Sequence, residues 1–184
     1  MKFLSRVPIQ IWVVLATLIL VVGGVVLLTL SQSDHSSQEA GSKPEGETTI
    51  GQEFTIQGAS HINPGTSHNP YNSDPPTSGP HYPTPANKGV HDSPLPDEIL
   101  IHNLEHGYIW VAYKPDISQE IKDKLKKFVE DDDWKMVMAP RPQNDAPIAL
   151  MAWGRHLKLE DFDEDQIKKF RNAYRNRGPE KTPN

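Results

Sequence analysis

The sequence of 184 residues contains no cysteine. This absence excludes disulfide bonds, a thiolate nucleophile, a cysteine-rich zinc site and a lipoprotein anchor. An exported domain of this composition would have to be held together by its core. Any metal ion would have to be bound by histidine, aspartate, glutamate or methionine side chains.

Charge is absent from residues 11–30, IWVVLATLILVVGGVVLLTL. Twenty uncharged residues are enough for a helix to cross the hydrocarbon core, so we expect one N-terminal transmembrane helix that acts as a signal-anchor. The alternative, a cleaved signal peptide, would have a shorter apolar segment and a small-x-small cleavage site, and LTLSQSD offers no clear one. Lys2 and Arg6 precede the segment, so the positive-inside rule predicts a cytoplasmic N-terminus (residues 1–10), a cell-membrane location and an extracytoplasmic C-terminal domain.

Large apolar residues are scarce in residues 31–50, SQSDHSSQEAGSKPEGETTI, which we expect to form a flexible linker. The domain proper is predicted at residues 51–179, followed by a frayed tail at 180–184. Without Lys2 and Arg6 the chain keeps 17 Lys and Arg against 24 Asp and Glu, a net charge of about −7. This charge argues against nucleic acid as a partner; an unknown protein partner stays open.

Proline is abundant between residues 61 and 96, where nine prolines remove backbone donors and fix φ. A segment of this kind forms few helices or strands. It also carries two tyrosines and four histidines, and a long loop inside a compact domain is usually functional or disordered. We therefore expect an ordered loop that wraps over the core.

In the rest of the domain the apolar residues recur with the spacing of helices and strands. We predict a small α+β domain with an antiparallel sheet and two or three packed helices. The expected elements are a helix at 95–106, a strand at 108–113, a helix at 118–130, strands at 135–139 and 148–153 joined by a hairpin-like loop RPQNDAP, and a helix at 163–175. For the first of these, a strand at 99–104 is the alternative, because short apolar runs are ambiguous.

The stretch HNLEH, residues 102–106, has the H-x-x-E-H spacing of one class of zinc peptidases. On a helix, His102, Glu105 and His106 share one face, and two imidazoles at i and i+4 can bind one metal ion. On a strand, the two histidines would be about 13 Å apart. His81 is the best additional ligand, because flanking prolines and a turn glycine fix its backbone. These residues therefore suit two interpretations: a metal site, for copper or zinc, at His81, His102, Glu105 and His106, or structural histidines that donate to backbone carbonyls.

Other residues that could bind a metal ion or an anion have simpler structural explanations. His61, His68 and His91 also fall in the histidine-rich segment, where histidines can equally donate to backbone carbonyls. Three methionines, Met136, Met138 and Met151, suit copper(I), but filling core space is the more common use. Two arginines that follow strands, Arg141 and Arg155, are expected in surface ion pairs.

Five motifs in order, PPTSGPHY, HNLEHGYIWVAY, APRP, ALMAWGR and RNRGPE, together resemble the DUF3105 family of bacterial, often membrane-anchored proteins. The resemblance covers residues 61–180. It implies an exported domain behind one anchor, with the residues around His81, His102, Glu105 and His106 as the family's hallmark. It implies no reaction, cofactor or partner.

Three functions follow from these observations. The first is a membrane-anchored, extracytoplasmic module that binds a transition metal. The second is a metal-free envelope scaffold or partner-binding domain, in which the histidines bridge loops. The third is a metallohydrolase with Glu105 as general base. The sequence offers no evident third metal ligand for such an enzyme, because the downstream glutamates, Glu180 included, are expected on solvated faces.

Overall fold

The structure, a computed structural model, describes residues 49–183. The predicted cytoplasmic N-terminus (1–10), the predicted transmembrane helix (11–30) and most of the predicted linker (31–50) lie outside the described residues. In the part of the chain from 49 to 183, no helix has the length and apolar character needed to cross a membrane.

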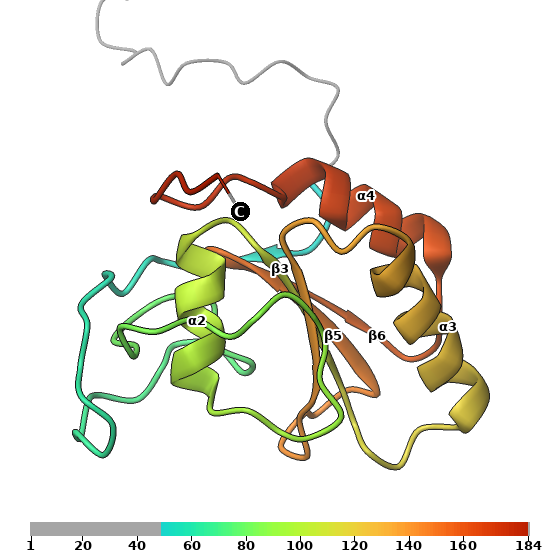
Figure 1. Cartoon of the computed structure of the whole chain (residues 1–184), viewed down its shortest axis with the longest axis horizontal. Coiled ribbons are helices and arrows are strands. Elements are labelled where there is room, and N and C mark those ends of the chain that lie inside the picture. The colour runs from blue at the N-terminus through green and yellow to red at the C-terminus, as the bar shows by residue number, and fades with distance from the viewer. Residues whose placement is uncertain (1–48, 184) are drawn as a thin grey trace, which may run out of the picture. The chain divides into compact units, whose positions relative to one another are not determined.

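A six-stranded mixed sheet forms the centre of the domain (Figure 1). The strands in chain order are β1 (Gln52–Glu53), β2 (Gly89–Val90), β3 (Ile109–Tyr113), β4 (Met136–Pro140), β5 (Ile148–Ala152) and β6 (Arg155–Leu159). Their order in the sheet is β1-β6-β5-β3-β4-β2. β4 pairs in parallel with both β2 and β3, and the other pairs are antiparallel.

The α+β class is confirmed, but the prediction of an antiparallel sheet is wrong for β4. The helix α3 (Gln119–Asp131) connects β3 to β4, and a crossover helix lets successive strands run in the same direction. The predicted hairpin between β4 and β5 is also wrong, because β3 lies between these strands. Residues 141–147 therefore cross from one side of β3 to the other.

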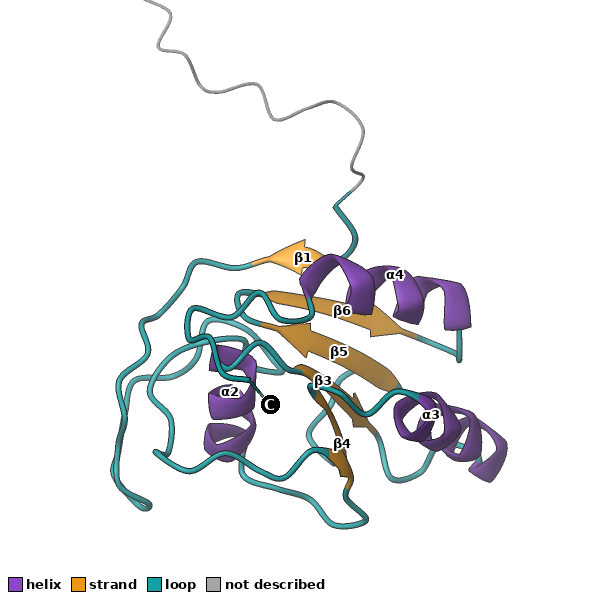
Figure 2. Ribbon diagram, turned by 45° about the horizontal axis from the view of Figure 1, so that its top comes forward, coloured by secondary structure: helices purple, strands orange, loops and turns teal. Residues whose placement is uncertain are grey.

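The sheet is covered on both faces (Figure 2). Ile109 and Val111 of β3 belong to a core with residues of α3 and α4 (Glu164–Tyr174), whereas Trp110 and Ala112 belong to a second core with residues of α2 (Asp97–Glu105). All five residues of β3 are buried. Burial on both faces explains why the central strands are almost continuously apolar in sequence.

The helix α2 confirms the helical prediction for residues 95–106 and excludes the alternative strand. It begins after Pro96, carries Asp97 and Glu98 in its first turn, and is followed by Gly107 with φ of 81°. Acidic residues are favourable at a helix N-terminus, and glycine adopts the left-handed conformation that ends a helix. Leu100 and Leu104 pack against the sheet, so the opposite side of the last turn faces the proline-rich loop.

The other two helices lie where they were predicted, and each has a side-chain cap at its N-terminus. The Ser118 side chain accepts a hydrogen bond from the Ile121 amide at the start of α3, and Asp163 accepts one from the Gln166 amide at the start of α4. Their apolar faces place Leu125, Phe128, Val129, Ile167 and Phe170 in the first core. Side-chain acceptors at this position stabilise a helix by about 1 kcal/mol.

The strand β6 was not predicted, because its sequence RHLKL contains three basic residues. It pairs with β5 through a turn at Gly154, whose φ is 72°. His156 and Leu159 are buried, whereas Arg155, Leu157 and Lys158 are partly exposed. Two-residue strands such as β1 and β2 leave too short a pattern to be predicted.

The proline-rich segment 61–96 is an ordered loop, as predicted, and it wraps around α2 (Figure 1). The Asn103 side chain of α2 exchanges two hydrogen bonds of 2.9 Å with the backbone of Ala86. The Tyr71 hydroxyl donates to the Pro80 carbonyl at 2.6 Å. The Asn103 bonds hold the loop against the helix that carries the histidine motif, and the Tyr71 bond joins two parts of the loop.

Candidate metal centre

The last turns of α2 bring His102, Glu105 and His106 together, as the helical spacing predicts. The distance between His102 Nε2 and His106 Nε2 is 3.0 Å. His102 and Glu105 are 4% and 7% exposed, and His106 is half-buried. Two ring nitrogens and a carboxylate therefore converge in a largely desolvated place.

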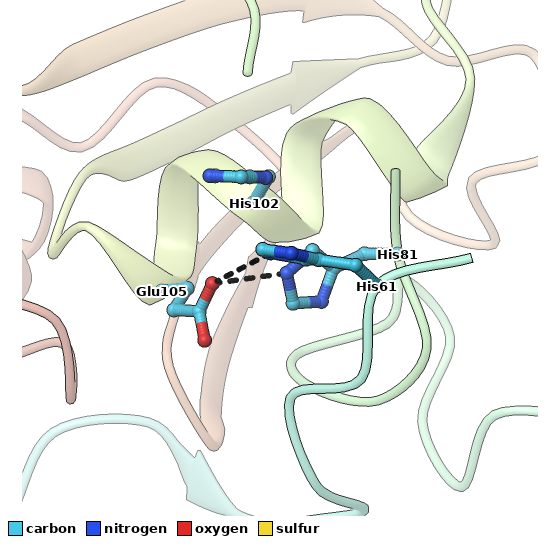
Figure 3. A group of neighbouring side chains, drawn as sticks. All are labelled: His61, His81, His102 and Glu105. Atoms are coloured by element: carbon cyan, nitrogen blue, oxygen red, sulfur yellow. Dashed lines mark hydrogen bonds and ion pairs between the residues drawn. The ribbon is translucent and has the colours of Figure 1, made fainter. Parts of the chain in front are cut away.

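The loop supplies two more imidazoles to the same place, those of His61 and His81 (Figure 3). A short parallel bridge joins the two segments: the His81 amide donates to the Ser60 carbonyl at 3.0 Å, and the Ile62 amide donates to the His81 carbonyl at 2.8 Å. His81 is fully buried, and its Nε2 lies 3.0 Å from Glu105 Oε2. His61 Nε2 lies 3.6 Å from the same oxygen, and the His61 ring stacks on that of His102.

Backbone carbonyls fix the orientation of two rings. His81 Nδ1 is 2.8 Å from the Gly79 carbonyl, and His102 Nδ1 is 2.6 Å from the Tyr82 carbonyl. A carbonyl only accepts, so each of these Nδ1 atoms carries the hydrogen. In a neutral ring the Nε2 atom then presents a lone pair, and in both residues Nε2 faces the cluster.

The electrostatics favour a neutral His102. Burial lowers the pKa of His102, and the neighbouring His106, His81 and His61 lower it further, while the hydrogen bond to Tyr82 acts in the opposite direction. A neutral imidazole is the form that binds metal ions.

The contact between His81 and Glu105 brings two acceptors together. In a neutral His81 the Nε2 lone pair faces the Glu105 carboxylate at 3.0 Å. Either a proton or a cation between the two atoms is needed to make this contact favourable.

The C-terminal segment, which was expected to fray, packs against the end of α2 instead. The Glu180 amide donates to the Glu105 carbonyl at 3.1 Å, and Glu180 Oε2 lies 3.2 Å from His106 Nε2. The Lys135 ammonium donates to the His106 carbonyl and to the Asn176 side chain. Glu180 is exposed, as expected, but the segment brings its carboxylate to the cluster.

The four predicted ligands fall into two overlapping groups among the described residues. One group contains His61, His81, His102 and Glu105, and the other contains His102, Glu105, His106 and Glu180. Within each group the candidate ligand atoms all lie within 4.8 Å of one another. His102 and Glu105 thus belong to both groups, whereas His81 and His106 belong to different ones.

Two members of these groups, His61 and Glu180, were not predicted as ligands. His61 was identified only as one of several loop histidines, and nothing in the sequence pairs it with His81. Glu180 gave no signal, because its position depends on how residues 176–182 pack on α2. The remaining loop histidines lie elsewhere: His91 Nε2 contacts the Asn87 carbonyl, and His68 Nδ1 contacts the Asn69 carbonyl.

The methionines and one arginine have structural roles. Met136 and Met138 are buried in the first core and Met151 in the second, as the core interpretation predicted. Arg141 is not in the expected surface ion pair. Its side chain is 9% exposed and binds both carboxylate oxygens of Asp97, at 2.9 and 2.8 Å, which anchors the start of α2 to the end of β4.

The spacing of the ligand atoms suits a metal ion. Two ligands bound at 2.0–2.1 Å to one tetrahedral ion are about 3.3 Å apart. The contacts of the cluster lie between 3.0 and 3.6 Å. Imidazole with carboxylate is a donor set that zinc and copper accept, and the carbonyls behind His81 and His102 provide the second layer of hydrogen bonds that such sites use.

Comparison with known proteins gives a family and no function. No curated protein and no solved structure matches the chain. One family model, described as a protein of unknown function (DUF3105), matches residues 61–184. The match begins at His61 and includes all six residues of the two groups, which confirms the resemblance that the sequence motifs indicate. The chain therefore belongs to the DUF3105 family.

Proposed function

We propose that the domain binds a transition metal, copper or zinc, in the cluster that contains His81, His102, Glu105 and His106, where His61 completes the group of His81, His102 and Glu105. The observation that carries this proposal is the orientation of the two buried rings. Both His81 and His102 donate Nδ1–H to a backbone carbonyl, which leaves Nε2 for an ion. Ligands that are already oriented lose little entropy on binding.

The first test is the metal content of the full chain, purified without a polyhistidine tag. We expect the wild type to retain zinc or copper, and the His102→Ala/His106→Ala double variant, which removes one candidate ligand of the first group and two of the second, to retain less of it. His91→Ala is the matched control, since His91 lies outside both groups and should keep the metal. A wild-type chain without metal, which does not take up zinc or copper when supplied, contradicts the proposal.

The metal-free scaffold makes a different prediction for the same variants. If the histidines only bridge the loop to α2, the double variant should unfold more easily, and added zinc should not change the stability of the wild type. If the cluster binds an ion, zinc should raise the free energy of unfolding of the wild type by about 2.7 kcal/mol at a hundredfold excess over Kd. Thermal denaturation with and without zinc separates these outcomes.

Glu105 is better placed as a ligand than as the general base of a hydrolase. Its Oε2 lies within 3.6 Å of two imidazoles, and it belongs to both groups of candidate ligands. Glu105→Gln should therefore weaken metal binding. Retained affinity together with lost hydrolytic turnover would support the hydrolase instead.

The location proposed for this domain is the outer side of a cell membrane. The support is the uncharged segment 11–30, with Lys2 and Arg6 before it and Asp34 as the first charge after it. The full chain should then stay with membranes after alkaline carbonate extraction, and protease added outside intact cells should digest the domain. Release into the soluble fraction would contradict this location.

A further inference from the structure

Six side chains at the end of α2 divide into two triads by their shortest contacts. The loop triad consists of His61, His81 and Glu105, in which Glu105 Oε2 contacts the two Nε2 atoms at 3.6 and 3.0 Å. The tail triad consists of His102, His106 and Glu180, in which His106 Nε2 contacts His102 Nε2 at 3.0 Å and Glu180 Oε2 at 3.2 Å. Each triad has the same composition, two imidazoles and one carboxylate.

Neither triad can satisfy all its contacts with the hydrogens that neutral rings carry. In the loop triad, His81 Nε2 and Glu105 Oε2 are both acceptors, because the His81 hydrogen is on Nδ1. In the tail triad, the single hydrogen on His106 Nε2 faces two acceptors, His102 Nε2 and Glu180 Oε2. A cation within each triad would contact all three of its ligand atoms.

The two triads are neighbours. His102 and Glu105 belong to both groups of atoms that lie within 4.8 Å of one another. The contacts of Glu105 with the loop histidines use Oε2, and the Glu105 carboxylate also belongs to the group with His102, His106 and Glu180. Carboxylates and imidazoles arranged in this way hold pairs of ions about 3.5–4 Å apart in two-metal sites.

The surroundings favour positive charge. His102, Glu105 and His106 lie at the last turn of α2, where the carbonyl ends of the helix carry partial negative charge, and the Lys135 ammonium already contacts one of these carbonyls, that of His106. Glu105 and Glu180 contribute two carboxylates. Four neutral imidazoles complete the ligand set without adding charge.

We propose that the cluster is a two-ion centre, with one divalent transition-metal ion in each triad and Glu105 between them. This inference rests on the proposed metal-binding function and adds its stoichiometry and the role of the C-terminal segment. The tail triad exists only because residues 176–182 dock on α2. Residues 176–182 thereby become part of the site, through Glu180.

The test is a zinc titration of the full chain, first stripped with a chelator, against a chromophoric competitor. The wild type should bind two zinc ions. Glu180→Gln and His61→Ala should each keep one ion tightly and bind the second more than about tenfold more weakly, since even partners that do not touch the metal contribute that much. Both side chains are about half exposed, so these variants should fold, which far-UV circular dichroism checks.

The control His91→Ala should bind two ions like the wild type. A wild type that binds one ion, with Glu180→Gln indistinguishable from it, overturns the two-ion centre and leaves the proposed metal binding intact. A Glu180→Gln variant that binds both ions as tightly as the wild type overturns the assignment of the tail triad. A wild type that binds no zinc overturns both proposals.

Discussion

At the scale of single residues, the candidate metal centre depends on two hydrogen bonds made by atoms that are not ligands. The carbonyls of Gly79 and Tyr82 orient the rings of His81 and His102. Both carbonyls belong to the proline-rich loop, whose fixed φ angles keep them in place. The prolines of this segment therefore matter to the candidate metal centre, although none of them is a candidate ligand.

A histidine outside the centre gives a prediction about pH. His156 is buried on β6 against Phe54, and its Nδ1 has no hydrogen-bond partner among the described residues. Burial lowers the pKa of His156, and Lys158 lowers it further, against the opposing effects of Pro75, Asp145 and Asp74. In the unfolded chain this imidazole titrates near pH 6.5.

The sign of the effect follows from proton linkage. Below about pH 6.5 the unfolded state binds a proton at residue 156 that the folded state does not, so the free energy of unfolding falls as the pH falls toward the folded pKa. Above that pH the contribution is constant. His156→Phe keeps a ring beside Phe54 and removes the titration.

Urea denaturation of the metal-free chain between about pH 7.5 and pH 5.5 measures this effect. His156→Phe should lose less stability over the range than the wild type does. The stability of His156→Phe should still depend partly on pH, because the pKa of His102 is lowered as well. Identical slopes in the two proteins would show that His156 is not buried in its neutral form.

At the scale of elements, the end of α2 connects the sheet, the loop and the C-terminal segment. The Asn176 amide donates to the Gly107 carbonyl at 2.7 Å, and the buried Lys135 side chain joins His106 to Asn176. A Cβ atom on Gly178 would lie 2.1 Å from the Glu105 carbonyl oxygen. Only glycine allows the segment to approach α2 this closely.

Replacing this glycine should release the segment. Gly178→Ala places its methyl group against backbone atoms, which cannot move aside as a side chain could, so we expect a loss of stability of about 1–3 kcal/mol. Residues after 176 should then become accessible to carboxypeptidase. The measurement is the rate of C-terminal trimming, followed by mass spectrometry.

Gly65→Ala is the matched control for this experiment. It replaces another glycine at a position where a Cβ atom meets nothing within 4 Å, although its φ of 83° makes the change mildly strained. It should leave C-terminal trimming unchanged. A tail that stays protected in Gly178→Ala would mean that the segment does not pack on α2 as described.

At the scale of the whole molecule, the sequence predicts what depends on local pattern. The spacing of apolar residues located α2, α3, α4 and the central strands, and the i, i+3, i+4 spacing predicted that His102, Glu105 and His106 converge. Strand direction was not predictable in this way. The parallel pairing of β3 with β4 depends on how α3 packs, and no local sequence pattern predicts that packing.

The candidate ligands likewise include some that a local pattern predicts and others that depend on long-range contacts. His81 was predicted from its rigid surroundings, but its partner His61 depends on a backbone bridge between residues 20 positions apart in the sequence. Glu180 depends on a contact with a helix that ends 75 residues earlier. Long-range pairing of this kind leaves no periodic signal, so the sequence indicated the motif at the centre and missed the residues that complete it.

The central claim, that ions bind among these histidines, is tested most directly by anomalous diffraction at the zinc edge from crystals of the zinc-loaded chain. The account predicts an anomalous peak about 2.0–2.2 Å from His61 Nε2, His81 Nε2 and Glu105 Oε2, and a second one at the same distance from His102 Nε2, His106 Nε2 and Glu180 Oε2. Zinc found only at His68 or His91, with no peak among these ligand atoms, would contradict it.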